Sequence, residues 1–197
     1  VIFIMTIIFH VAAQEDVLGF QSFVDPDTGL VISSVGLQNK NVSHMYFTAQ
    51  TWNSDSTKLI LNADIDQYRR TNFVYYDTIT KETKIIDNSY KANYYQGVAD
   101  FNNKFYYTVE DRIYKYDFVT NQTTLIARHP AGVHFYGVPS VTNDGEIMSV
   151  YMRDSENKIR IIGLVNTIIG VYTEVISSQY VKNKFAAPND IIDHPII

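Results

Sequence analysis

Short apolar runs separated by polar turns recur along the chain from residue 20 onward. The runs at 20–24 and 30–35 flank the turn sequence Asp25-Pro26-Asp27-Thr28-Gly29. Pro26 presets the φ angle that such a turn needs, and Gly29 can adopt a positive φ. The pattern therefore predicts a β-hairpin. No segment shows sustained helical periodicity, so we predict an all-β chain.

A unit of strands and turns then recurs three times. The copies are marked by three residue pairs, each nine positions apart: Asp77 and Ile86, Asp117 and Ile126, and Asn166 and Val175. Successive copies begin 40 and then 49 residues apart. Units of this length with several strands each are typical of β-propeller blades. We predict an incomplete β-propeller over residues 20–197, with about three blades and an opening strand pair; a sandwich of irregular hairpins is the alternative.

The first residues have a different pattern. Residues 1–9 are almost wholly apolar, and small residues lead to Gln14. The run is too short to span a bilayer, and it is typical of a signal peptide cleaved near Ala13 or Gln14. We therefore predict a signal peptide over residues 1–14, truncated at its start, and a secreted or periplasmic protein with no stable membrane span. A buried strand is the alternative.

Charge and cysteine content narrow the function classes. The formal net charge is -5, so no basic surface for a nucleic acid is predicted. The chain has no cysteine, which excludes disulfides and thiolate metal sites. An anionic ligand would need its own local group of arginine, lysine or histidine side chains, or a metal ion.

Several motifs resemble the opening of the oligogalacturonate lyase family. They are the turn at 25–29, the segment Met45-Tyr46-Phe47-Thr48, the turn and strand at 52–60, the hairpin at 74–82, and His194-Pro195. The resemblance runs from about residue 20 to residue 197. The hairpin motifs also occur in TolB-like propellers. The chain departs from the family pattern at Ser56 and Lys81, where glycine is usual, and at Asp193.

The resemblance implies the N-terminal portion of a seven-bladed β-propeller that cleaves short galacturonate chains by β-elimination. A divalent metal ion, typically manganese, would bind the substrate carboxylate, a histidine would act as the base, and an arginine would assist. Oligogalacturonides are then the implied partner. By order along the chain, the metal ligands would follow Ile197, so none is predicted within these residues.

β-Elimination needs a base that titrates near the working pH and a cation that neutralises the developing charge. With the resemblance, His194 is the candidate base and Arg160 the candidate assisting cation, while Arg153 and His44 are candidate substrate-binding residues. The alternative for each is a solvent-facing side chain. His129 and His134, five positions apart, could bind a metal or simply belong to a polar loop.

A second function class stays open at this point. A non-catalytic TolB-like propeller that binds a protein or a glycan would show the same blade repeats. The repeat spacing predicts the fold and does not distinguish a lyase from a binding module.

Overall fold

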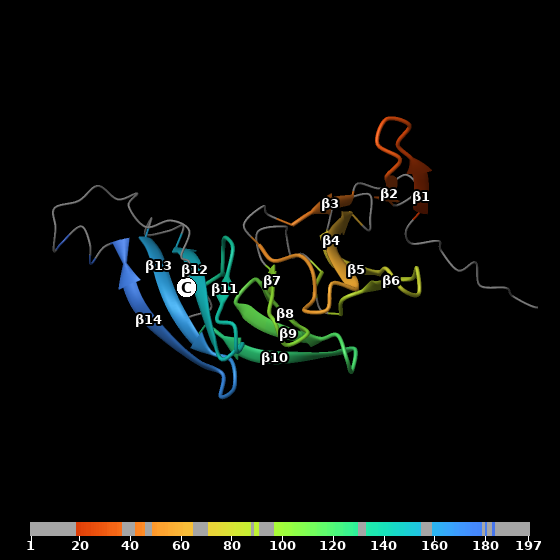
Figure 1. Cartoon of the computed structure of the whole chain (residues 1–197). Helices are drawn as coiled ribbons and strands as arrows, with labels where there is room; N and C mark the ends of the chain where they lie inside the picture. The colour runs from red at the N-terminus through yellow and green to blue at the C-terminus, as the bar shows by residue number, and fades with distance from the viewer. Residues whose placement is uncertain are drawn as a thin grey trace, which may run out of the picture.

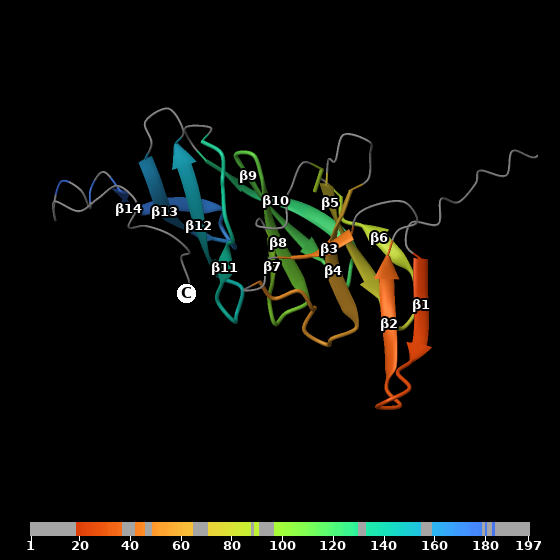
Figure 2. The same ribbon diagram turned by 90° about the horizontal axis from the view of Figure 1, so that it is seen from above.

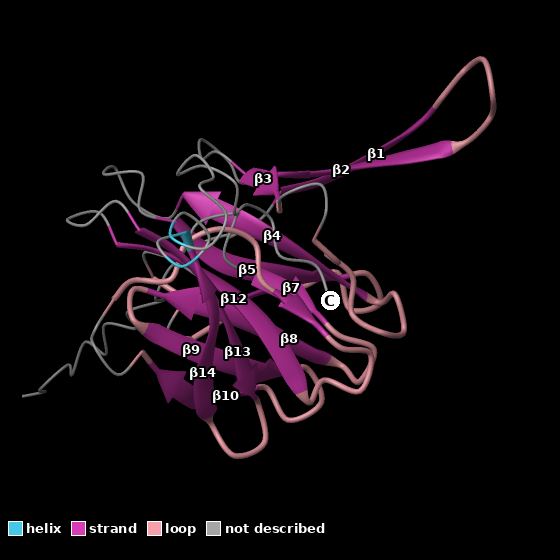
Figure 3. Ribbon diagram, turned by 90° about the vertical axis from the view of Figure 1, so that its left-hand side faces the viewer, coloured by secondary structure: helices cyan, strands magenta, loops and turns pink. Residues whose placement is uncertain are grey.

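The structure is a computed structural model that describes residues 19–36, 42–45, 49–64, 71–87, 89–90, 97–129, 133–154, 159–178, 180 and 183. The fourteen elements among these residues are all β-strands, which confirms the all-β prediction (Figure 3). Ser178, Tyr180 and Asn183 have a helical backbone conformation. Within the described ranges, no helix is long and apolar enough to cross a membrane. The predicted signal peptide and His194 lie outside the described residues.

The predicted N-terminal hairpin is present. Strand β1 (Gly19–Val24) pairs antiparallel with β2 (Val31–Gly36). Between them, the Asp25 side chain accepts a hydrogen bond from the Asp27 N–H at 2.9 Å, and Gly29 has a φ of 70°. The hairpin projects away from the other strands (Figure 3).

Three four-stranded antiparallel sheets follow, each formed by four strands consecutive in the chain (Figure 1). We call them blades 1, 2 and 3. Blade 1 contains β3 (Val42–His44), β4 (Lys58–Asp64), β5 (Thr71–Asp77) and β6 (Thr83–Ile85). Blade 2 contains β7 (Gly97–Ala99), β8 (Lys104–Val109), β9 (Arg112–Asp117) and β10 (Gln122–Arg128). Blade 3 contains β11 (Ser140–Val141), β12 (Ile147–Asp154), β13 (Ile159–Asn166) and β14 (Val171–Ser177).

The nine-residue spacing in the sequence has a structural cause. Asp77, Asp117 and Asn166 each end the third strand of a blade, and each side-chain oxygen accepts hydrogen bonds from two backbone N–H groups of the next turn. Such Asx interactions fix a tight turn. Each turn then contains a residue of positive φ, in the order Lys81, Asn121 and Gly170. We call this the capped end of the blades; the second and third strands are joined at the other end, the linker end.

Two of these caps also hold an ion pair. Asp77 lies 3.3 Å from the ammonium group of Lys58, and Asp117 contacts that of Lys104. Burial alone would raise the pKa of Asp117, but Lys104 and the N–H groups of Thr120 and Val119 together hold it below its usual value.

The blades stack in chain order (Figure 2). Blades 1 and 2 enclose a buried aromatic cluster in which the rings of Phe73 and Phe105 meet edge to face, with centroids 4.9 Å apart. Blades 2 and 3 enclose a second cluster, which includes Tyr106, Phe135 and Met152. Hydrogen bonds across the capped end, such as Asn53 Nδ2 to Asn103 Oδ1 at 2.9 Å, also link neighbouring blades.

The sequence did not predict the short first strand of any blade. In blade 1 this strand is interrupted, because His44 pairs with Leu61 whereas Trp52 forms its bridge with Leu59. Blade 3 is built the same way. Phe135 bridges Met152, and the strand resumes only at Ser140, which pairs with Ser149.

Candidate functional site

Two arginines lie opposite each other at the linker end of blade 3. Arg153 on β12 is the direct partner of Arg160 on β13. Side chains alternate along a strand, so Arg153 shares a face with Tyr151, and Arg160 shares it with Ile162. The intervening Met152 packs toward blade 2. The two guanidinium groups therefore occupy the outer face of blade 3, which points away from blade 2.

The pairing of Arg153 with Arg160 does not by itself stabilise the fold. Directly opposed like charges on adjacent strands destabilise a sheet, because their Cβ atoms lie only about 5 Å apart. Arg153 is exposed and Arg160 is half-buried, and the Arg160 N–H donates to Ser178 Oγ at 3.0 Å. Arginine can bind a carboxylate through two parallel hydrogen bonds, so this pair is a candidate binding site for a carboxylate.

The first strand of blade 3 extends this arrangement. The bridge between Phe135 and Met152 sets a register in which Tyr136 lies opposite Tyr151 and His134 lies opposite Arg153. The Tyr136 N–H donates to the Tyr151 carbonyl at 2.8 Å, in agreement with that register. His134 and Tyr136 are both exposed. The backbone thus places His134, Arg153 and Arg160 in one row across the blade.

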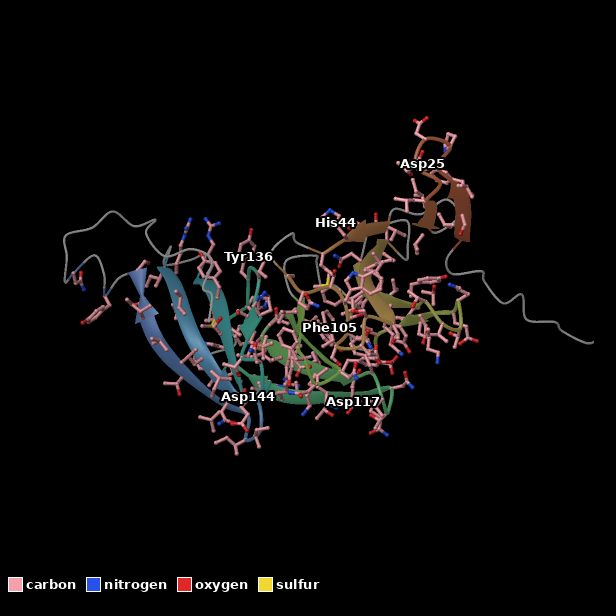
Figure 4. All side chains as sticks on the ribbon, viewed as in Figure 1. Asp25, His44, Phe105, Asp117, Tyr136 and Asp144 are labelled. Atoms are coloured by element: carbon pink, nitrogen blue, oxygen red, sulfur yellow. The ribbon has the colours of Figure 1, made fainter. Side chains whose placement is uncertain are left out.

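His44 lies elsewhere. It is exposed on β3, and its Nδ1 atom contacts the Met45 carbonyl oxygen. As the direct partner of Leu61 it occupies the face of blade 1 that points away from blade 2, whereas the next residue, Met45, packs toward blade 2. His44 and Tyr136 are on the same side of the molecule, opposite Asp117 and Asp144 (Figure 4). The two predicted substrate-binding residues, His44 and Arg153, therefore lie on the two outer faces of the stack and do not meet.

The two histidines that could have formed a metal site differ in their surroundings. His129 is buried, its ring lies 4.9 Å from that of Tyr172, and its Nδ1 accepts from the Val133 N–H at 3.3 Å. Burial lowers its pKa, although Glu174 and Asp111 act in the opposite direction. Among the described residues, no group of three or more histidine, aspartate or glutamate side chains could hold a metal ion.

Sequence reasoning did not single out Tyr136. The signal that could have found it is the order Phe135-Tyr136-Gly137, in which an apolar ring, an amphipathic ring and a glycine follow one another. Phe135 is 2% exposed and Tyr136 is 48% exposed, as expected for adjacent residues of a strand.

Comparisons with known proteins give a likeness in fold. No protein-family model and no curated protein matches the sequence. The fold is similar to that of an oligogalacturonate lyase from Vibrio parahaemolyticus, with a TM-score of 0.67 and 17% identity over 81% of this chain and 47% of the lyase. An oligogalacturonate lyase in complex with manganese gives a TM-score of 0.71 at 17% identity, over 91% of this chain and 50% of the lyase.

TolB from Acinetobacter baumannii is also similar, with a TM-score of 0.51 and 15% identity over 76% of this chain and 36% of TolB. At these identities the likeness concerns the fold alone. Together with the three stacked four-stranded sheets, it identifies an incomplete β-propeller of about three blades and an opening strand pair. The chain spans half or less of the length of each of these proteins.

Proposed function

We propose that this chain is the N-terminal portion of an oligogalacturonate lyase-like protein, which cleaves short galacturonate chains by metal-assisted β-elimination. The observation that carries the proposal is the cross-strand pair of Arg153 and Arg160 at the linker end of blade 3. The fold likeness to two oligogalacturonate lyases supports the same substrate class.

The chemistry assigns a role to each residue. A base removes the proton on the carbon next to the uronate carboxylate, a carbon–carbon double bond forms, and the bond to the leaving sugar oxygen breaks. Negative charge develops on the carboxylate during this step, and fixed cations stabilise it. Arg153 binds the carboxylate, Arg160 stabilises the developing charge, and His194 is the proposed base. The substrate-binding role of His44 stays a prediction.

A divalent metal ion would neutralise further charge on the carboxylate, and one of the similar lyases is in complex with manganese. The described residues do not provide a group of ligands for such an ion. No described residue of this chain is therefore assigned as a metal ligand.

Export belongs to the same proposal. Residues 1–14 would act as a signal peptide and direct the protein to the periplasm or the exterior, where pectin fragments occur. Cleavage near Ala13 or Gln14 would be seen as a shortened N-terminus in the exported protein.

The activity test is the ultraviolet absorbance of the unsaturated product when the full-length protein is mixed with digalacturonate, with and without manganese. Arg153→Gln and Arg160→Gln should each lower kcat/KM by about 10-fold to 100-fold, because a hydrogen bond to a charged group contributes about 1.5–3 kcal/mol. Arg128→Gln is the matched control. Arg128 also lies opposite an arginine, Arg112, but on blade 2, where Asp111 is 3.7 Å from Arg112.

A non-catalytic TolB-like propeller is the second candidate, and the similarity to TolB favours it. It predicts no product under any metal condition, and glycan or protein binding that the two arginine variants leave unchanged. Product formation that needs Arg153 and Arg160 would exclude it.

A further inference from the structure

The turn of the N-terminal hairpin has the same hydrogen bonds as the capped turns of the three blades. The Asp25 side chain accepts from the N–H two residues later, as the cap residue of each blade does. In all four turns the carbonyl of the cap residue accepts from the N–H four residues later. That fourth residue has a positive φ in every case, and in the hairpin it is Gly29. Strands β1 and β2 therefore have the form of the third and fourth strands of a blade.

The described residues provide no first and second strands for such a blade. β1 and β2 form a two-stranded sheet of their own, whereas each blade has four strands. In blade 1 the second strand pairs with the third along its whole length. The corresponding edge of β1 has no strand partner within the described ranges. A hairpin without further strands is marginally stable in water, so this edge is suited to accept another strand.

The hydrogen bonds of the hairpin show which groups lie on that edge. The N–H groups of successive residues in a strand point to opposite sides. Because the Asp25 N–H donates to the Leu30 carbonyl across the hairpin at 2.8 Å, the Val24 N–H points away from β2. Val31 is the direct partner of Val24. Its N–H points away from β1, toward the opposite edge of the hairpin.

The hairpin also lies where a neighbouring blade would lie. Val35 packs against the apolar cluster on the outer face of blade 1, which contains Leu61 and Val74. Figure 2 shows the hairpin beside blade 1, at the end of the stack opposite blade 3. In a closed ring this place belongs to the last blade. The predicted signal peptide leaves only residues 15–18 before β1, too few for two strands, so the first two strands would come from later in the chain.

We propose that β1 and β2 are the outer half of the last propeller blade. Two strands that follow residue 197 in the full-length protein pair with the free edge of β1 and close the ring. The inference needs the propeller fold and neither candidate function. Asp77 and Asp117 each contact the lysine that begins the second strand of their blade. A lysine should therefore begin the incoming second strand and lie beside Asp25.

Hydrogen exchange of the full-length protein, measured at single residues, tests the pairing. The Val24 N–H should exchange at least about 100-fold more slowly than the Val31 N–H, because only Val24 gains a strand partner. Tyr76 holds the same position before the cap in blade 1, so its N–H is the reference for a paired third strand. Equally fast exchange at Val24 and Val31 would mean that the hairpin is a free arm. Slow exchange at Val31 alone would mean that the other edge is paired, and either result overturns the proposal.

Val24→Pro and Val31→Pro give a matched test of stability. Both side chains are exposed, by 61% and 69%, and proline removes the N–H at each position. In the full-length protein Val24→Pro should lower the thermal midpoint by at least about 5 °C more than Val31→Pro does. Val24→Ala keeps the N–H and controls for the lost side chain. Equal midpoints for the two proline variants would contradict the pairing, and the proposed function would stand, because neither experiment depends on activity.

Discussion

At the scale of single residues, His129 joins blades 2 and 3 through its uncharged form. Its backbone N–H donates to the Asp111 carbonyl, and its ring packs against Tyr172 of β14 and Phe135. Burial lowers the pKa of the imidazole below 6.5. Because folding favours the neutral ring, this contribution to stability is fully present above the ordinary histidine pKa and decreases as the pH falls below it.

Acidification should therefore weaken the unaltered protein at this site. Between about pH 7 and about pH 5, its thermal midpoint should fall by a few degrees more than that of His129→Phe, at about 2–4 °C per kcal/mol of stability. Phenylalanine keeps the ring contacts and cannot be charged. Differential scanning calorimetry across this range measures the two slopes. Substitution of the exposed His134 by glutamine should leave the slope unchanged, and equal slopes for all three proteins would contradict the assignment.

Local side-chain contacts could be predicted from the sequence, whereas contacts between distant residues could not. The caps at Asp77, Asp117 and Asn166 were visible because each side chain bonds to residues two and three positions later. The site depends on long-range register. His134 and Arg153 are 19 residues apart, and only the bridge between Phe135 and Met152 aligns them.

At the scale of elements, the predictable strands were those bounded by local turn signals. The second and fourth strands of each blade follow a turn at the capped end, the third strand ends at that end, and all three were predicted. The first strands have two or three residues each, and in blades 1 and 3 they are interrupted. A strand of that length has too few residues to show alternation, so its pairing is set by the neighbouring strand and not by its own sequence.

The hairpin between the third and fourth strands gives a matched test at this scale. The same turn position is Lys81 in blade 1, with a φ of 62°, and Gly170 in blade 3, with a φ of 71°. A side chain at positive φ costs about 1–2 kcal/mol, and a Cβ atom at Gly170 would overlap the Ile126 carbonyl oxygen. Gly170→Ala should therefore lower the free energy of unfolding by at least about 1–2 kcal/mol.

Lys81→Gly should instead raise the free energy of unfolding. It relieves the strained conformation but adds backbone entropy to the unfolded chain, for a net gain of roughly 0.5–1 kcal/mol. Urea unfolding of both variants measures the difference. A stabilised Gly170→Ala, or a Lys81→Gly less stable than the unaltered protein, would show that other contacts dominate this turn.

At the scale of the whole molecule, the blades depend on one another because each sheet buries a face only against its neighbour. Phe105 belongs to blade 2 but is fully buried against Phe73 and Met45 of blade 1. The repeat spacing predicted that the blades stack. The many aromatic residues of the sequence supply the side chains that are buried between them. The sequence did not specify which rings meet, because that depends on how two separate sheets face each other.

Phe105→Ala should test this coupling. Removing a buried phenylalanine costs about 3–5 kcal/mol, and here the loss falls on the contact between two blades. Trp52, the single tryptophan of the chain, lies in blade 1, so its fluorescence reports that blade, whereas far-ultraviolet circular dichroism reports all the strands. In the unaltered protein the two unfolding curves should coincide. In Phe105→Ala the fluorescence transition should move to lower urea than the dichroism transition, because blade 1 loses its packing against blade 2, its only described neighbour in the stack other than the hairpin.

The control is Phe23→Ala, at a phenylalanine that is 55% exposed. It should shift neither curve by more than about 0.5 kcal/mol. Curves that still coincide in Phe105→Ala would mean that the stack unfolds as one cooperative unit despite the lost contact.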